Sequence, residues 1–269
     1  MNLDIRAVET LVTNMFNKKG DKVVEMNIEA LNEGHRLMTE QLNEVKGDFV
    51  LEETNHSPHL YMIGNDAIGL GALSAGSRFM AAYPITPASE IMEYMIANLP
   101  KVGGTVVQTE DEIAAANMAI GSNYAGVRAF TASAGPGLSL MMEAIGLSGM
   151  TETPFVIINT QRGGPSTGLP TKQEQSDLMQ MIYGTHGDIP KIVVAPTDAE
   201  DAFYLTMEAF NLAETYQCPV IVLSDLQLSL GKQTVDALDY NQIEINRGET
   251  IQSDIERDED DKTYFKRYA

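Results

Sequence analysis

Residues 128–149 read RAFTASAGPGLSLMMEAIGLSG and contain a strand-to-helix unit. A short apolar run at 128–132 leads into a glycine-rich turn at 131–137, and a helical pattern follows at 136–149. Short apolar runs of this kind are typical of strands that are buried on both faces of a sheet. The stretch therefore predicts a strand followed by a helix, the unit from which parallel sheets are built.

The same alternation extends on both sides of this stretch, from about residue 60 to residue 225. Further strands are expected at 79–82, 105–108, 155–159, 192–195 and 220–223. Further helices are expected at 65–76, 88–98, 111–125 and 198–216. Such alternation predicts an α/β fold, with a mostly parallel sheet flanked by helices on both faces. Because ligands bind beyond the carboxyl ends of such strands, the loops that follow the strands are the candidate sites.

The segments outside this region have a different composition. Residues 1–57 carry a charged amphipathic helical pattern that breaks at Lys19-Gly20-Asp21, and a short strand is expected within them at 49–51. Residues 236–269 are rich in acidic side chains and are expected to form a linker. We therefore divide the chain into a helical appendage with a linker at 1–57, an α/β domain at 58–235 and an acidic linker after it.

Charge and composition argue against several classes of function. The 269 residues carry 18 basic and 38 acidic side chains, and the formal net charge of −20 repels phosphate backbones and anionic membranes. The single cysteine, Cys218, cannot form an internal disulfide, and no cysteine cluster is present for zinc or iron–sulfur chemistry. The sequence has neither a signal-peptide pattern nor an uninterrupted apolar window long enough to span a membrane. We expect a cytoplasmic protein that binds no nucleic acid, no membrane and no metal of its own.

Two of the loops that follow predicted strands contain proline and acidic residues. Pro84 and Thr86 belong to the turn YPITP at 83–87, where Thr86 either caps the next helix or presents its hydroxyl to a ligand. Glu110, Asp111 and Glu112 precede a helix of small side chains. Acids at this position either cap the helix or supply a carboxyl group beside an apolar crevice.

The other two loops are rich in glycine. Ser133 and Gly135 belong to TASAGPG at 131–137, which either permits a tight bend or binds an anion. This stretch matches neither the dinucleotide-binding motif G-x-G-x-x-G nor the P-loop motif G-x-x-x-x-G-K-[ST]. The loop QRGGPSTG after the strand at 155–159 places Arg162 near two hydroxyl groups. An arginine in this setting offers a fork for a carboxylate or phosphate, although surface loops also carry arginines that bind nothing.

Four segments resemble the alpha subunit of the 2-oxoacid:ferredoxin oxidoreductases, a family of thiamine-diphosphate enzymes. They are YPITPASE at 83–90, EDEIAAANMAIGSNYAG at 110–126, FTASAGPGLSLMMEAIGLSGMTETP at 130–154 and QRGGPSTGLPTKQEQSDL at 161–178. The resemblance covers about 60–225 and implies the pyrimidine-binding domain of that family. Residues 1–57 resemble the tail of a gamma domain that some members fuse ahead of the alpha part.

The resemblance implies thiamine-diphosphate-dependent oxidative decarboxylation of a 2-oxoacid to an acyl-coenzyme A, with electrons passed to ferredoxin. Glu112 matches the glutamate that hydrogen-bonds the aminopyrimidine ring of the cofactor, and Glu110 is the fallback for this catalytic role. The residues implied to bind the cofactor are Pro84, Thr86, Glu112, Ser133 and Gly135. Those implied to bind the substrate are Thr86, Arg162, Ser166 and Thr167.

The resemblance also implies that the site is shared with a second chain. This sequence lacks the G-D-G…N signature that anchors magnesium and diphosphate, so a beta subunit is expected to supply Mg²⁺ and an iron–sulfur cluster, and the enzyme is expected to be active only with it. The hydroxyl-rich loop favours 2-oxoglutarate, with pyruvate and branched-chain 2-oxoacids as alternatives. Two alternative hypotheses are a non-catalytic subunit-assembly module of the same fold and a nucleotide-binding α/β domain.

Overall fold

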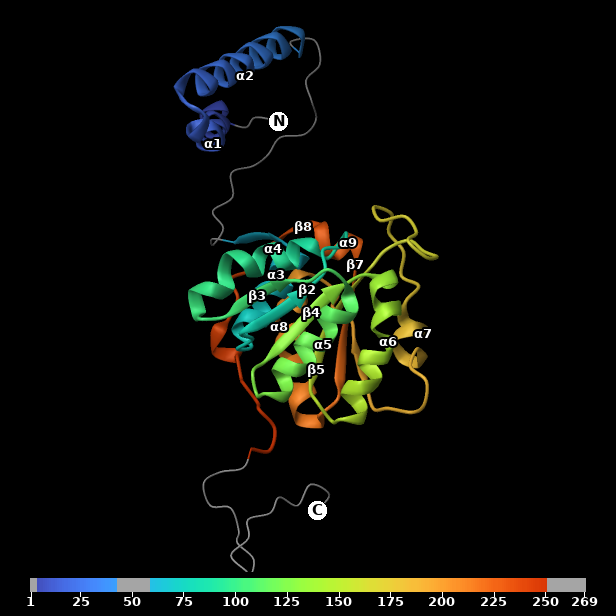
Figure 1. The fold of residues 1–269 in the computed structure, drawn as a ribbon. Coiled ribbons are helices and arrows are strands. Elements are labelled where there is room, and N and C mark those ends of the chain that lie inside the picture. Colours follow the sequence, from blue (N-terminus) through green and yellow to red (C-terminus); the bar gives the residue numbers. More distant parts are fainter. Residues whose placement is uncertain (1–3, 43–58, 251–269) are drawn as a thin grey trace, which may run out of the picture. The chain divides into compact units, whose positions relative to one another are not determined.

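The computed structural model describes residues 4–42 and 59–250. The chain divides into two compact units, Met1–Ser57 and Pro58–Ala269, and each is described by itself. In the first unit, α1 (Ile5–Phe16), η1 (Asn17–Lys19) and α2 (Asp21–Leu42) form a helical pair, with Gly20 at a φ of 94° in the turn between them (Figure 1). This turn coincides with the break seen in the helical pattern. The strand expected at 49–51 lies outside the described residues.

The second unit is built on a six-stranded parallel sheet with the strand order β3-β2-β4-β5-β7-β6 (Figure 1). Its strands are β2 (Phe79–Ala82), β3 (Thr105–Gln108), β4 (Ala129–Ser133), β5 (Phe155–Gln161), β6 (Ile192–Val194) and β7 (Pro219–Asp225). In the longest pairing, Phe155 of β5 lies opposite Pro219 of β7. The six strands expected from the sequence are confirmed, with small shifts at their ends.

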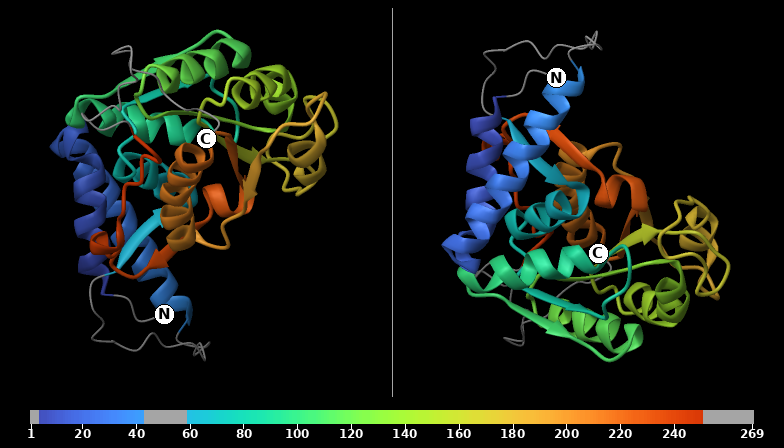
Figure 2. Two further views of the ribbon diagram at one scale, coloured as in Figure 1. Left: turned by 90° about the horizontal axis from the view of Figure 1, so that it is seen from below. Right: turned by 90° about the horizontal axis from the view of Figure 1, so that it is seen from above.

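Helices cover both faces of this sheet (Figures 1 and 2). One face carries α3 (Gly64–Ser74), α4 (Ser89–Asn98) and α8 (Ala199–Tyr216), and the other carries α5 (Glu112–Tyr124) and α6 (Gly135–Met150). In β5, Val156 and Ile158 pack into the first core, whereas Phe155 and Ile157 pack into the second. Because both faces of the inner strands β2, β4, β5 and β7 are buried, these strands contain mostly apolar residues. The α/β prediction is confirmed.

Several short elements were not expected from the sequence. A separate antiparallel pair joins β1 (Leu60–Ile63) to β8 (Lys232–Val235), and of these eight residues only Val235 is buried. The others are η2 (Leu99–Val102), α7 (Leu178–Tyr183), α9 (Leu226–Leu230) and η3 (Tyr240–Gln242). Short or half-exposed elements of this kind leave no clear period in a sequence. Within the part of the chain that the structure describes, no helix is both long enough and apolar enough to cross a membrane.

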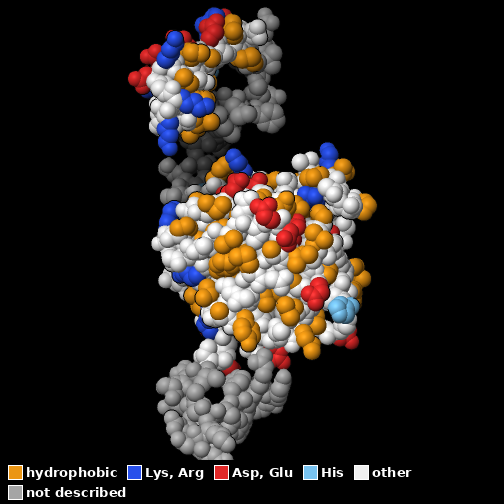
Figure 3. Space-filling model, in the orientation of Figure 1, with side chains coloured by type: hydrophobic (Ala, Val, Ile, Leu, Met, Phe, Trp, Pro, Cys, Tyr) orange, Lys and Arg blue, Asp and Glu red, His pale blue; other side chains and the backbone are white. Residues whose placement is uncertain are grey.

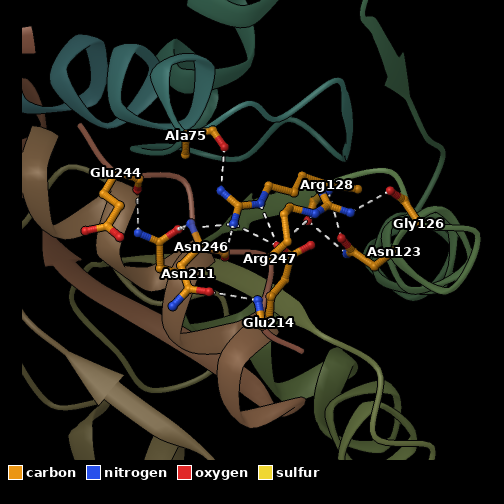
Figure 4. A network of polar contacts seen from close by, with 11 residues as sticks. Ala75, Asn123, Gly126, Arg128, Asn211, Glu214, Glu244, Asn246 and Arg247 are labelled. Atoms are coloured by element: carbon orange, nitrogen blue, oxygen red, sulfur yellow. Dashed lines mark hydrogen bonds and ion pairs between the residues drawn. The ribbon is translucent and has the colours of Figure 1, made fainter. Parts of the chain in front are cut away.

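Residues 236–250, which the sequence assigns to an acidic linker, pack against the domain instead. Leu238 is only 7% exposed and belongs to the core that includes residues of α3, α4 and α8. Arg128, beside β4, donates hydrogen bonds both to Glu214 of α8 and to the carbonyl oxygen of Asn246 (Figure 4). The predicted linker therefore begins too early. The polar composition of residues 236–250 suggested a linker, whereas the groups that bind this segment, such as Arg128, come from distant positions in the chain.

Candidate active site

The four predicted loops follow four consecutive strands of the sheet, β3, β2, β4 and β5, at their carboxyl ends. Arg162, just after β5, donates from Nη1 to the carbonyl oxygen of Thr86, after β2, at 2.7 Å. Glu112, after β3, lies beside the turn after β4: a Cβ added at Gly137 would lie 3.0 Å from Glu112 Oε1 and 2.0 Å from Ser133 Oγ. The fold thus brings the predicted residues together in two neighbouring groups.

Of the three consecutive acids at 110–112, Glu112 is the buried one. It is 8% exposed, whereas Glu110 and Asp111 are exposed. Asp111 is the N-cap of α5 and accepts a hydrogen bond from the Ala114 N–H at 2.7 Å. Glu112 has no hydrogen-bond partner among the residues that the structure describes, and the buried Ser133 Oγ beside it also lacks one. A nearly buried carboxylate and a buried hydroxyl without partners are both available to form hydrogen bonds with a ligand.

Arg162 is a buried cation at the second group. It is 6% exposed, and its Nη2 donates to the carbonyl oxygen of Thr167 at 2.8 Å. Its Nε is buried without a partner, and no carboxylate among the described residues forms an ion pair with it. Burial lowers the pKa of the Arg162 guanidinium, which still carries its charge at neutral pH. A buried guanidinium without a counter-ion is suited to an anionic ligand.

A pocket of about 580 Å³ lies between the Arg162 loop and the first turn of α6. Its lining includes Gly135, Arg162, Ser166, Thr167, Asp177 and Gln180. Ser166 and Thr167, two of the four residues with hydroxyl groups in this lining, are exposed, and Ser166 has a φ of 59°. The volume is in the range of pockets that bind small molecules. In residues 4–42 and 59–250, no group of three or more His, Cys, Asp or Glu could hold a metal ion.

Two residues of this edge were missed from the sequence, Asn159 and Asp177. Asn159 Nδ2 donates to Asp177 Oδ2 at 3.0 Å, and the Asp177 N–H donates to Gln161 Oε1 at 3.0 Å. Burial raises the pKa of the Asp177 carboxyl, the hydrogen bond from Asn159 lowers it, and the charge of Glu174 adds to the increase. A polar residue at the end of an apolar run, as in FVIIN at 155–159, could have identified Asn159 from the sequence. Asp177 lies in a loop with no comparable pattern.

Thr86 does not cap the following helix, so the first of the two alternatives for this residue is wrong. Helix α4 begins at Ser89 with Ala88 as its N-cap. Thr86 is exposed in a separate turn, and Pro84 before it is half-buried. The carbonyl oxygen of Thr86 is held by Arg162, so the chain completes one turn before the helix begins.

This chain is similar in sequence to curated proteins. The 2-oxoglutarate synthase subunit KorA of Methanothermobacter thermautotrophicus is 48% identical over 191 residues, which are 71% of this chain and 51% of that protein. The alpha subunit of 2-oxoacid:ferredoxin oxidoreductase 1 of Aeropyrum pernix is 39% identical over 259 residues, which are 93% of this chain and 40% of that protein. The chain therefore spans about half the length, or less, of these curated relatives.

A solved structure gives a similar result. The 2-oxoglutarate:ferredoxin oxidoreductase from Magnetococcus marinus, with 2-oxoglutarate, coenzyme A and succinyl-CoA bound, matches with a TM-score of 0.88 at 42% identity. The match covers 97% of this chain and 46% of that chain.

The family model for the thiamine-diphosphate-binding part of pyruvate flavodoxin/ferredoxin oxidoreductases matches residues 70–263. This range is well over half of the chain and contains all four loops at the carboxyl edge of the sheet. The chain therefore belongs to the thiamine-diphosphate-binding family of the pyruvate flavodoxin/ferredoxin oxidoreductases.

Proposed function

We propose that this chain is the pyrimidine-binding part of the alpha subunit of a 2-oxoacid:ferredoxin oxidoreductase. The enzyme would decarboxylate 2-oxoglutarate oxidatively to its acyl-coenzyme A and pass the electrons to ferredoxin. The observation that carries this proposal is the nearly buried, unpartnered carboxylate of Glu112 at the carboxyl edge of the sheet. The names of the relatives and of the solved structure support the reaction and the substrate class.

The residues around Glu112 fit thiamine diphosphate, because a planar ring with polar edges would satisfy both the carboxylate and the buried Ser133 hydroxyl. When bound, the cofactor supplies the nucleophilic carbon that attacks the keto group of the substrate. Glu112 would hold a proton between its carboxyl group and the ring nitrogen of the aminopyrimidine. We assign further contacts with the cofactor to Gly135, to Pro84 and to Thr86, which flank Glu112 in neighbouring loops.

Arg162 would bind the carboxylate next to the keto group. Its unpartnered Nε and the remaining N–H groups of the guanidinium belong to a side chain that is largely buried, and they can donate to an anion. The hydroxyl groups of Ser166 and Thr167, in the lining of the same pocket, would bind a second carboxylate. Of the substrates considered, 2-oxoglutarate carries a second carboxylate, whereas pyruvate and the branched-chain 2-oxoacids carry one. Binding of a second carboxylate would therefore favour 2-oxoglutarate.

We propose that a beta subunit completes the site. Helices α5 and α6 expose five large apolar side chains, Ile113, Met118, Leu140, Leu147 and Met150. Figure 3, in the orientation of Figure 1, shows hydrophobic side chains on the face where these two helices lie. An apolar face of this kind is typical of a surface that another chain covers. Glu112 is the first residue of α5, so a chain packed there would reach the proposed cofactor. This partner would bring Mg²⁺, the contacts with the diphosphate and an iron–sulfur cluster.

The test is viologen reduction by the full-length subunit assembled with its beta subunit, supplied with coenzyme A and with 2-oxoglutarate, pyruvate or a branched-chain 2-oxoacid. We expect Glu112→Gln to lower the rate with 2-oxoglutarate by about 10²- to 10⁴-fold without loss of assembly. The matched control is Glu110→Gln, which changes an exposed acid two positions earlier and should leave the rate unchanged.

Each other result has a defined meaning. Wild-type turnover in the Glu112→Gln complex would remove Glu112 from catalysis, and a loss with Glu110→Gln alone would move the role to Glu110. A preference for pyruvate would correct the substrate and keep the reaction. An assembled, thiamine-loaded complex that reduces nothing with any 2-oxoacid would leave a subunit-assembly module of the same fold.

A further inference from the structure

Asn65, near the start of α3, is completely buried and holds the backbone of the turn that carries Thr86. Its Nδ2 donates to the carbonyl oxygen of Pro87 at 2.7 Å. Arg162 holds the adjacent carbonyl oxygen, that of Thr86, also at 2.7 Å. Two consecutive carbonyl groups of one turn are therefore held by side chains from two different parts of the fold.

The contacts of Asn65 are not those of a helix cap or of simple packing. Its side chain makes no hydrogen bond to α3 among the described residues, and its other contact is a longer one, 3.4 Å from Nδ2 to Glu90 Oε2. Its Oδ1 is buried without a partner. An unpaired buried oxygen lowers stability, so packing alone does not account for an asparagine at this position. What asparagine adds at this position is the N–H group that reaches Pro87.

Helix α3 is itself firmly fixed, so Asn65 is a rigid support. A Cβ added at Gly64 would lie 2.4 Å from the carbonyl oxygen of Leu228. A Cβ added at Gly69 would lie 2.5 Å from Cδ1 of Tyr94 on α4. Backbone packed this closely on both sides leaves α3 little room to shift.

We propose that Asn65 is a positioning residue for the substrate site. It fixes the turn at 83–88 through the Pro87 carbonyl group, so that Thr86 and Arg162 keep the arrangement that binds the 2-oxoacid. This inference rests on the proposed function. Because small displacements of the residues that support a site weaken it, loss of Asn65 acts mainly on substrate binding, while Glu112 and Ser133, which lie in other loops, stay in place.

The test compares Asn65→Ala with Asn123→Ala in the assembled holoenzyme. Asn123 is the matched control: its Nδ2 also donates to backbone, to the carbonyl oxygens of Ala119 and Ala129 at 2.9 Å, but at the amino end of β4, away from the site. We expect Asn65→Ala to raise the KM for 2-oxoglutarate about fivefold, the effect of one lost hydrogen bond, with kcat changed less than twofold. Asn123→Ala should leave the KM unchanged.

A second measurement is independent of turnover. Hydrogen exchange should become faster in a peptide covering 83–91 in Asn65→Ala and not in Asn123→Ala, since the Ala88 N–H is bonded within this turn, to Ile85 O at 2.7 Å. Wild-type KM and wild-type exchange in Asn65→Ala would overturn the proposal, as would equal changes in both variants. Should Asn65→Ala fail to assemble, the milder Asn65→Ser is read in the same way. Absence of 2-oxoacid turnover in the wild-type complex would instead refute the proposed function, and the exchange experiment would still decide whether Asn65 holds the turn.

Discussion

At the scale of single residues, Gly137 allows Glu112 and Ser133 to lie together. An alanine Cβ there would lie 2.0 Å from Ser133 Oγ and 2.9 Å from Glu112 Cγ, and both residues are nearly or fully buried. Something must therefore shift in a packed environment, and such overpacking typically costs about 1–3 kcal/mol. We expect Gly137→Ala to lower the free energy of unfolding by this amount, measured by urea denaturation of the chain.

Gly146 is the matched control because it lies in the same helix, α6, and an added Cβ would meet no atom within 4 Å. Replacing a helical glycine with alanine in open space usually stabilises a protein by about 0.5–1 kcal/mol. Gly146→Ala should therefore raise the urea midpoint, opposite in sign to Gly137→Ala. A stabilising Gly137→Ala would show that Glu112 and Ser133 do not pack against this turn.

At the scale of secondary-structure elements, one buried arginine ties β4 and α8 to the end of the domain (Figure 4). The Arg128 side chain is 1% exposed and donates to Glu214 Oε2 at 2.7 Å and to Asn211 Oδ1 at 3.1 Å. Arg128→Met would leave the Glu214 carboxylate, 10% exposed, without its main partner. Breaking a buried pair from one side costs about 3–5 kcal/mol, so we expect a loss of this size in the free energy of unfolding.

Arg247 provides the comparison for this prediction, since its Nε lies 3.2 Å from the same Glu214 oxygen but its side chain is 40% exposed. It also donates to the carbonyl oxygen of Gly126 at 2.8 Å. An exposed pair contributes at most about 1 kcal/mol, so Arg247→Met should cost much less than Arg128→Met. Equal losses in the two variants would contradict the distinction between a buried and an exposed partner.

The central elements of the parallel sheet could be predicted from the sequence because burial on both faces leaves continuous apolar runs, as at 79–82 and 155–158. The β1–β8 pair could not, because each strand is half exposed and its partner is far away in the chain. The sequence offered two acids, Glu110 and Glu112, and only the structure distinguishes the exposed one from the buried one.

The same contrast holds within the candidate site. Arg162 could be predicted because it follows a strand within a marked glycine-rich loop. Asn65 could not, because its partner Pro87 is 22 residues away and no local pattern relates the two. Residues that bind ligands tend to lie in recognisable loops, whereas residues that support those loops depend on tertiary contacts.

At the scale of the whole molecule, the net charge of −20 opposes the compact state by self-repulsion. Salt screens this repulsion, because the Debye length falls from about 30 Å at 0.01 M to about 8 Å at 0.15 M ionic strength. We expect the urea midpoint to rise when NaCl is increased over this range, followed by circular dichroism at neutral pH. Arg128→Met should show a similar rise, since its own pair is buried and screened little. A midpoint that falls with NaCl would mean that attractive surface pairs, such as Arg36 with Glu33 at 2.6 Å, outweigh the net repulsion.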